Sequence, residues 1–308
     1  MKPIPLYGSL AFAATLAGAL FTHAQTPHLK VALTFDDLPI HGALPPGETR
    51  LDIAKSVLST LKHEHMPPVY GFINAEKLQT QPDTIDVLRL WRSAGEPLGS
   101  HTYSHMDLEV HTPQEFEADI AKNEPPLRSL AGTPDWHMFR YPYLHEGETL
   151  EKRQEIQRYL KANGYQVAEV TLDFEDYLWN DPYARCSAKK DTAAIAELEK
   201  TYLATADQYI GVFRDLTHQL YGRDIPYVLL LHIGAFDARM LPQLIALLRQ
   251  RGFTFTTLEE AQKDPAYAID PAAGVKYGGA LQEMLAAARK IKMPPNSKPY
   301  KQLEAICR

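Results

Sequence analysis

Seven short runs of apolar residues recur along the chain, and stretches with helical periodicity separate most of them. The runs lie at 30–35, 69–73, 97–101, 138–141, 166–171, 227–232 and 254–257. The run from Tyr227 to Leu231 is unbroken, which is typical of a parallel strand buried on both faces. Seven such strand–helix units predict an α/β protein with a distorted (β/α)7-type barrel.

Two segments extend this barrel pattern. Residues 192–220 form an Ala-, Leu- and Glu-rich helical pattern that is longer than a simple crossover. We expect a helical insertion over about 179–223, before the last strands, which either walls the site or only enlarges a barrel helix. The main domain is expected at 25–264, and residues 265–308 form a C-terminal extension with one helix around 279–291.

Polar, reactive side chains stand where the apolar runs end. Asp36 and Asp37 follow the first run, while His101 ends the third and His105 comes four residues later. The carboxyl ends of parallel strands meet at one edge, so these groups are expected to lie together. Two imidazoles and one carboxylate with open positions suit Zn²⁺ or a similar ion. The spacing predicts both rings on one face of a helical turn, and strand alternation predicts that the two carboxylates face opposite ways.

Three later strand ends add Arg140, Asp173 with Asp176, and His232. Each motif alone has a commonplace explanation, because an Asp pair often caps a turn and twelve histidines make chance pairs common. Together they meet the needs of amide hydrolysis: an activated nucleophile, stabilisation of the oxyanion and a proton for the departing nitrogen. The combination predicts a hydrolase.

With these motifs in this order, residues 30–258 resemble the polysaccharide deacetylase family, metal-dependent carbohydrate esterases with a NodB-homology domain. The resemblance rests on Thr-Phe-Asp-Asp at 34–37 and His-Thr-x-x-His at 101–105, supported by the three later motifs. It implies that Asp37, His101 and His105 hold the metal. Zn²⁺ is the expected ion, with Co²⁺ or Ni²⁺ as alternatives.

The resemblance also implies catalytic roles. Asp36 would be the general base for the attacking water, and Arg140 would keep Asp36 ionised. His232 would be the general acid for the leaving amine, because Leu-x-His ends at this residue. Asp176 would orient its imidazole, with Asp173 as the alternative.

The oxyanion and the walls of the pocket involve residues around the first and third motifs. The backbone N–H of Tyr143 would stabilise the oxyanion, an interaction that commonly contributes a few kcal/mol. Leu38 stands where the family has glycine, which predicts a branched apolar side chain near the metal. His41, His145 and Glu146 are either additional substrate contacts or surface loop residues. Five aromatic residues near the motifs are candidates for stacking on sugar rings or for core packing: Tyr103, Tyr141, Tyr143, Tyr177 and Trp179.

These roles predict a hydrolase that removes N-acetyl or O-acetyl groups from a saccharide. A hydrolase of a non-sugar linear amide on the same fold is the alternative that an enclosed pocket would favour. A carbohydrate-binding protein without turnover is a further alternative, although binding alone needs neither an acid nor a base. A structural metal site would require a fourth protein ligand, for which His41 or Glu175 is available.

The charge and the chain ends limit the partners and the compartment. A net charge of −6 without a basic stripe argues against nucleic acid and anionic membranes as partners. Lys2 precedes an apolar stretch at 10–21, and the small residues that follow predict a signal peptide, residues 1–24, cleaved after Ala24. We therefore expect a periplasmic or secreted protein without stable membrane insertion. Cys186 and Cys307 either pair in that oxidising compartment or remain free thiols.

Overall fold

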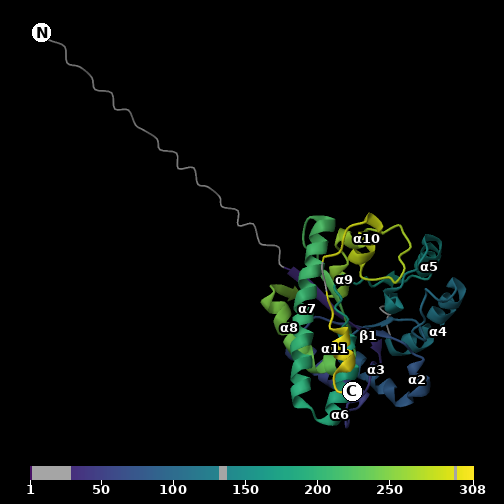
Figure 1. The fold of residues 1–308 in the computed structure, drawn as a ribbon. Helices are drawn as coiled ribbons and strands as arrows, with labels where there is room; N and C mark the ends of the chain where they lie inside the picture. The colour runs from purple at the N-terminus through teal and green to yellow at the C-terminus, as the bar shows by residue number, and fades with distance from the viewer. Residues whose placement is uncertain (2–28, 132–136, 295–296) are drawn as a thin grey trace.

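The computed structural model describes residue 1 and residues 29–131, 137–294 and 297–308. Seven parallel strands form one curled sheet with helices around it, which confirms the predicted α/β barrel class (Figure 1). The strands are β1 (Leu29–Leu38), β2 (Tyr70–Ile73), β3 (Leu98–Ser100), β4 (Met138–Phe139), β5 (Gln166–Val167), β6 (Tyr227–His232) and β7 (Phe253–Phe255). Apart from Met1, the predicted signal peptide and its cleavage point lie outside the described residues.

Strand β1 is the centre of the sheet. The order is β5-β4-β3-β2-β1-β6, and β7 pairs with the start of β1. The chain after β5 then reaches the opposite end of this order, where Leu172 forms a parallel bridge with Leu229 of β6. This bridge brings the two ends of the sheet together, so the carboxyl ends of β1, β3, β4 and β6 surround one region.

The helices between the strands, and α9 after the last strand, pack around the sheet. They are α1 (Arg50–His63), α2 (Lys77–Thr80), α3 (Ile85–Ser93), α4 (Pro113–Ala131), α5 (Leu150–Ala162), α8 (Ala235–Gln250) and α9 (Leu258–Ala261). Helix α1 begins where the sequence predicts a helix start, because Thr49 and Asp52 form a reciprocal capping box. Gly95 follows α3 with a φ of +92°, which lets the chain turn directly into β3.

Two helices occupy the segment predicted as a helical insertion. Helix α6 (Asn180–Lys189) and the long α7 (Thr192–Tyr221) pack against each other and against α8. The C-terminal segment adds α10 (Leu281–Arg289), close to the predicted helix, and α11 (Tyr300–Ala305). Cys186 and Cys307 form a disulfide with Cα atoms 5.2 Å apart. Of the two alternatives that the sequence left open, a disulfide or two free thiols, the structure has the disulfide. No helix within the described residues is both long and apolar enough to cross a membrane.

Candidate active site

An irregularity at the end of β1 places Asp36 and Asp37 in the same cavity. The register between β1 and β2 shifts between Phe35 and Leu38, and Asp37 has a φ of +66°. The nitrogen Nε2 of His101 consequently lies 3.8 Å from Asp36 Oδ2 and 3.7 Å from Asp37 Oδ1. The expectation that the two carboxylates face opposite ways is therefore wrong, because the bulge interrupts the alternation of the strand.

The two histidines after β3 are held by a loop and not by a helical turn, so that part of the prediction is wrong. Thr102 and His105 both have a φ near +60°, which interrupts any helical path between the two rings. Asn74 Nδ2 donates to the carbonyl oxygens of His101 and Thr102 and holds this loop against the end of β2. The rings still converge, with centroids 4.8 Å apart.

Asp37, His101 and His105 provide a donor set that fits a divalent metal. Asp37 Oδ1 lies 3.4 Å from Nε2 of His105, is buried and has no hydrogen-bond partner. His101 Nδ1 donates to the carbonyl oxygen of Arg140 at 2.8 Å, which leaves its Nε2 as the lone-pair nitrogen. Burial lowers the pKa of His101 to about 4 and that of His105 to about 3, so both rings are neutral at pH 7. An orphaned carboxylate oxygen facing two neutral imidazoles is the arrangement that a cation would complete.

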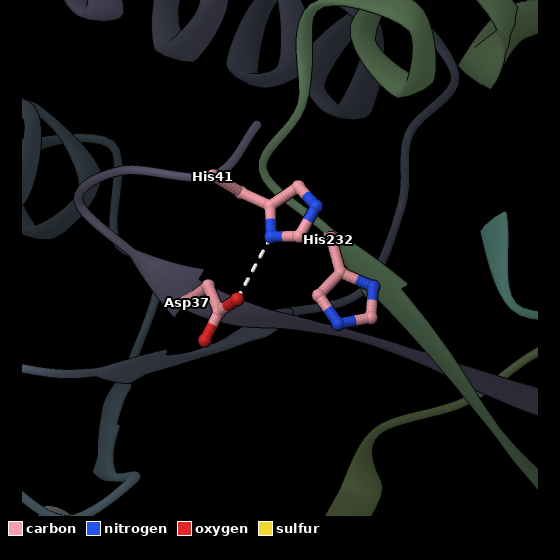
Figure 2. Close-up of side chains that lie close together, drawn as sticks. All are labelled: Asp37, His41 and His232. Atoms are coloured by element: carbon pink, nitrogen blue, oxygen red, sulfur yellow. Dashed lines mark hydrogen bonds and ion pairs between the residues drawn. The ribbon is translucent and has the colours of Figure 1, made fainter. Parts of the chain in front are cut away.

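His41 and His232 form a second group with Asp37 (Figure 2). His41 Nδ1 donates to Asp37 Oδ2 at 2.8 Å, and the His41 and His232 rings have centroids 4.6 Å apart. His41 uses its Nδ1 on the Asp37 carboxylate itself, whereas Nε2 of both His101 and His105 faces the orphaned Asp37 Oδ1, so the group with His101 and His105 is the better metal set. Glu175, the other suggested fourth ligand, instead pairs with Lys298.

The charge state of Asp37 follows from its neighbours. Burial by itself would raise the pKa of Asp37, but nearby Lys77 and the hydrogen bond from His41 hold that pKa well below its usual value. Lys77 Nζ lies 3.9 Å from Asp37 Oδ1 and donates to the carbonyl oxygen of Ile40. Asp37 is therefore an ionised carboxylate with one oxygen hydrogen-bonded to His41 and the other without a hydrogen bond.

Asp36 forms a buried ion pair with Arg140 on the other side of this set. Arg140 Nη1 donates to both Asp36 oxygens at 3.3 and 3.2 Å, while Nε donates to the carbonyl oxygen of Ala168 at 2.6 Å. Burial raises the pKa of Asp36, the Arg140 guanidinium lowers it, and the balance stays above the usual value. A carboxylate with a raised pKa accepts a proton more readily than an exposed one, which suits a base.

His232 ends β6 and is held by Asp176. Its Nδ1 donates to Asp176 Oδ1 at 2.8 Å, and its backbone N–H donates to Oδ2 at 2.7 Å. Asp173 instead accepts from the backbone N–H of Glu175, so Asp176 is the carboxylate that contacts the imidazole. The ring is thereby fixed with Nε2 as its free nitrogen.

A second buried carboxyl, Asp237, stands behind Asp176 and was missed at the sequence level. Asp237 accepts from Asn180 Nδ2 at 2.6 Å and from the hydroxyl of Tyr202 at 3.1 Å, and it is hydrogen-bonded to Asp176. Burial raises the pKa of both carboxyls, and their mutual hydrogen bond raises that of Asp237 while lowering that of Asp176. Asp237 is thus a second buried carboxyl in direct contact with the group that holds His232. Its place five residues after His232, at the start of a helix, was the only signal available.

One cavity of about 540 Å³ is lined by the acidic and histidine side chains of the site, Asp36, Asp37, His41, His101, His105 and His232. Of the five aromatic candidates, Tyr143 and Tyr177 are exposed in its wall, with 57% and 40% of their surfaces accessible, and Tyr143 has a φ of +58°. Tyr141 lines the cavity although it is buried, whereas Tyr103 and Trp179 are core residues outside the lining. Two of the five aromatic candidates therefore offer open ring surface to a ligand.

Several other residues predicted near the metal have different places. Leu38 is fully buried, and its side chain packs close to Gly71 in the core and not in the cavity. His145 lines the cavity and bonds to Asp107, whereas Glu146 is buried in an ion pair with Arg153. Helices α6 and α7 contribute none of the described lining residues. Leu38 and the segment of α6 and α7, which would have made the pocket small and apolar, therefore lie outside the cavity lining.

The fold is an α/β barrel, and the site is a set of carboxylates and histidines at the carboxyl ends of its strands. Together they define the class of protein. The family model described as polysaccharide deacetylase matches residues 23–168. This match supports a polysaccharide deacetylase family for the chain.

Individual relatives agree with this assignment. A peptidoglycan-N-acetylglucosamine deacetylase of Bacillus cereus is 27% identical over 150 residues, 48% of this chain and 46% of the relative, so the match spans about half of that protein. A chitin deacetylase of Colletotrichum lindemuthianum is 24% identical over 239 residues, 76% of this chain and 79% of the relative. A CE4 family pseudoenzyme from Bacillus anthracis has a TM-score of 0.52 at 13% identity and covers 76% of this chain and 66% of its own. The last likeness concerns the fold alone.

Proposed function

We propose that this protein is a metal-dependent hydrolase that removes N-acetyl groups, with O-acetyl groups as a second substrate type, from a saccharide. The observation that carries the proposal is the convergence of three units in one cavity: Asp36 with Arg140, His232 with Asp176, and the orphaned Asp37 oxygen facing two neutral imidazoles. The family membership supports the reaction class.

In this proposal Asp37, His101 and His105 hold the ion, Zn²⁺ first and Co²⁺ or Ni²⁺ as alternatives. When bound, such an ion supplies Lewis acidity and lowers the pKa of a coordinated water to about 7. Asp36 takes the proton of the attacking water, because its raised pKa makes it a competent base and Arg140 keeps its oxygens oriented.

Tyr143 and His232 carry out the remaining steps. The backbone N–H of Tyr143 stabilises the oxyanion of the tetrahedral intermediate, commonly by a few kcal/mol. His232 gives the proton of Nε2 to the departing amine while Asp176 holds Nδ1. A binding protein needs neither an acid nor a base, so the presence of both beside the same donor set favours an enzyme.

Acetate release from a panel of acetylated oligosaccharides tests the proposal. Metal-stripped protein is compared with protein refilled with Zn²⁺, Co²⁺ or Ni²⁺, and Asp36→Asn serves as the matched control. We expect release that returns with metal and is lost in Asp36→Asn. Release that persists in Asp36→Asn would contradict the mechanism, and a panel silent with every metal would favour a non-sugar amide hydrolase or a binding protein.

We also propose that residues 1–24 direct export and that residues 25–264 form the catalytic unit. The basic and apolar pattern before Ala24 and the Cys186–Cys307 disulfide support an oxidising, extracytoplasmic compartment. N-terminal sequencing of the mature protein should begin at Gln25. A mature protein that still begins at Met1 would contradict the export proposal.

A further inference from the structure

The C-terminal segment, of which the structure describes residues 274–294 and 297–308, lies along one side of the candidate active site. Tyr277, Gly278, Gly279, Glu283 and Lys298 belong to the cavity lining, although all of them follow the last strand of the barrel. Figure 1 shows this segment running from α10 along α7 to α11. The cavity wall is therefore shared between the barrel and the segment after it.

The first attachment of this segment is to the loop that carries Tyr143. The backbone N–H of Val275 donates to Gly147 O at 3.2 Å, and that of Gly279 donates to Leu144 O at 3.3 Å. Gly278 approaches the loop so closely that an added Cβ would lie 2.0 Å from the oxygen of Leu144. Only glycine fits this contact, so the segment lies directly on the oxyanion side of the site.

The second attachment is to the chain between β5 and α6. The backbone N–H of Leu281 donates to Val170 O at 2.8 Å, which holds the start of α10 against the barrel. Further along, Lys298 Nζ and the hydroxyl of Tyr300 both contact the Glu175 carboxylate at 2.6 Å. Lys298 is only 10% exposed at its side chain, so this pair closes the wall beside Asp173 and Tyr177.

The third attachment holds the end of the chain on α6. Arg185 Nη2 donates to the carbonyl oxygens of Leu303 and Ile306 at 2.9 and 3.2 Å, and the Cys186–Cys307 disulfide lies next to these bonds. The segment is therefore fixed at three places, to the loop of Tyr143, to the chain after β5 and to α6. A cavity of about 540 Å³ is in the range that encloses a small ligand, and a polymer passing through the site would need both sides open.

We propose that the C-terminal segment closes one side of the active site, so that it accepts a short N-acetylated saccharide or the end of a chain and excludes the interior of a polymer. This inference rests on the proposed deacetylase function. Tyr277, which is 70% exposed and lines the cavity, together with Tyr143 and Tyr177 offers ring faces on which a terminal sugar can stack.

The test uses the full-length, zinc-loaded protein and oligomers of N-acetylglucosamine from one to five units. The position of each lost acetyl group is read by fragment mass spectrometry. Tyr277→Gly, which suits a φ of +65°, and the double variant with Lys298→Ala open the wall. Lys301→Ala, an exposed change three residues further on, is the matched control, and thermal melting verifies folding.

For the pentamer we expect deacetylation at one terminal unit by the wild type and by Lys301→Ala. In Tyr277→Gly and the double variant the ratio of internal to terminal product should rise by at least about tenfold. Wild-type protein that removes internal acetyl groups as fast as terminal ones would overturn the inference while leaving the deacetylase function intact. Absence of acetate release from every oligomer would overturn the proposed function itself.

Discussion

Replacing Arg140 with methionine should destabilise the protein strongly. Arg140 is 1% exposed, and its guanidinium donates to both oxygens of Asp36, which is also 1% exposed. Its Nη2 also donates to Thr34 Oγ1, and its guanidinium lies 4.7 Å from the centre of the Phe72 ring. In Arg140→Met a carboxylate stays buried without its cation, while the methionine refills part of the volume.

Removing one partner of a buried ion pair costs about 3–5 kcal/mol, and we expect a loss of that size in the free energy of unfolding at pH 7. A typical domain has only about 5–15 kcal/mol in total, so the effect is large. Burial already raises the pKa of Asp36 above 3.8, and losing Arg140 raises it further. Between the unfolded-state and folded-state pKa values the folded protein binds more protons, so the variant's stability falls as pH rises.

Urea denaturation of metal-free protein at pH 5 and pH 8 measures this effect. The deficit of Arg140→Met relative to wild type should be smaller at pH 5, because Asp36 is then more often neutral. The double variant Asp36→Asn with Arg140→Met leaves no buried charge, so its loss should be less than the sum of the single losses by about 1–3 kcal/mol. Additive losses, or a deficit of the same size at both pH values, would refute this account of the pair.

Three further changes test other parts of the site. His41→Phe removes the hydrogen bond that fixes Asp37 Oδ2, so zinc should bind about tenfold more weakly by isothermal titration; unchanged affinity would show that His41 does not position Asp37. Asp176→Asn should lower kcat by roughly 10²-fold or more with little change in KM, because His232 loses its anchor; steady-state kinetics with normal kcat would contradict the acid role. Cys307→Ser should lower the free energy of unfolding by about 2–5 kcal/mol in denaturant titration, and a loss below 1 kcal/mol would show that other contacts hold the tail.

The strands were predictable because their signal is local. An unbroken apolar run that ends at a polar residue, such as the one in β6, is typical of a buried strand. The predicted bounds of this strand match those observed. The residue types at the strand ends were equally visible, since Asp37, His101 and His105 stand at the motifs themselves. Their convergence follows from the parallel sheet, in which carboxyl ends meet at one edge.

The local conformations within the motifs were not predictable. The spacing of His101 and His105 fits a helix, but the loop reaches the same convergence with residues at positive φ. Alternation along β1 failed at Asp37 because a bulge depends on how β2 pairs with β1, which is information outside the strand. Leu38 looked like a pocket residue, yet the space beside Gly71 admits its side chain into the core.

The sequence by itself determined the class of fold, the order of its strands along the chain, and the carboxylates and imidazoles available for chemistry, because these depend on periodicity and residue type. Only the tertiary structure decided which groups touch. Asp237 behind Asp176 and the segment around Lys298 on Glu175 join residues 61 and 123 positions apart (237 − 176 and 298 − 175). Such contacts depend on the packing of whole elements, for which a single sequence carries no local signal.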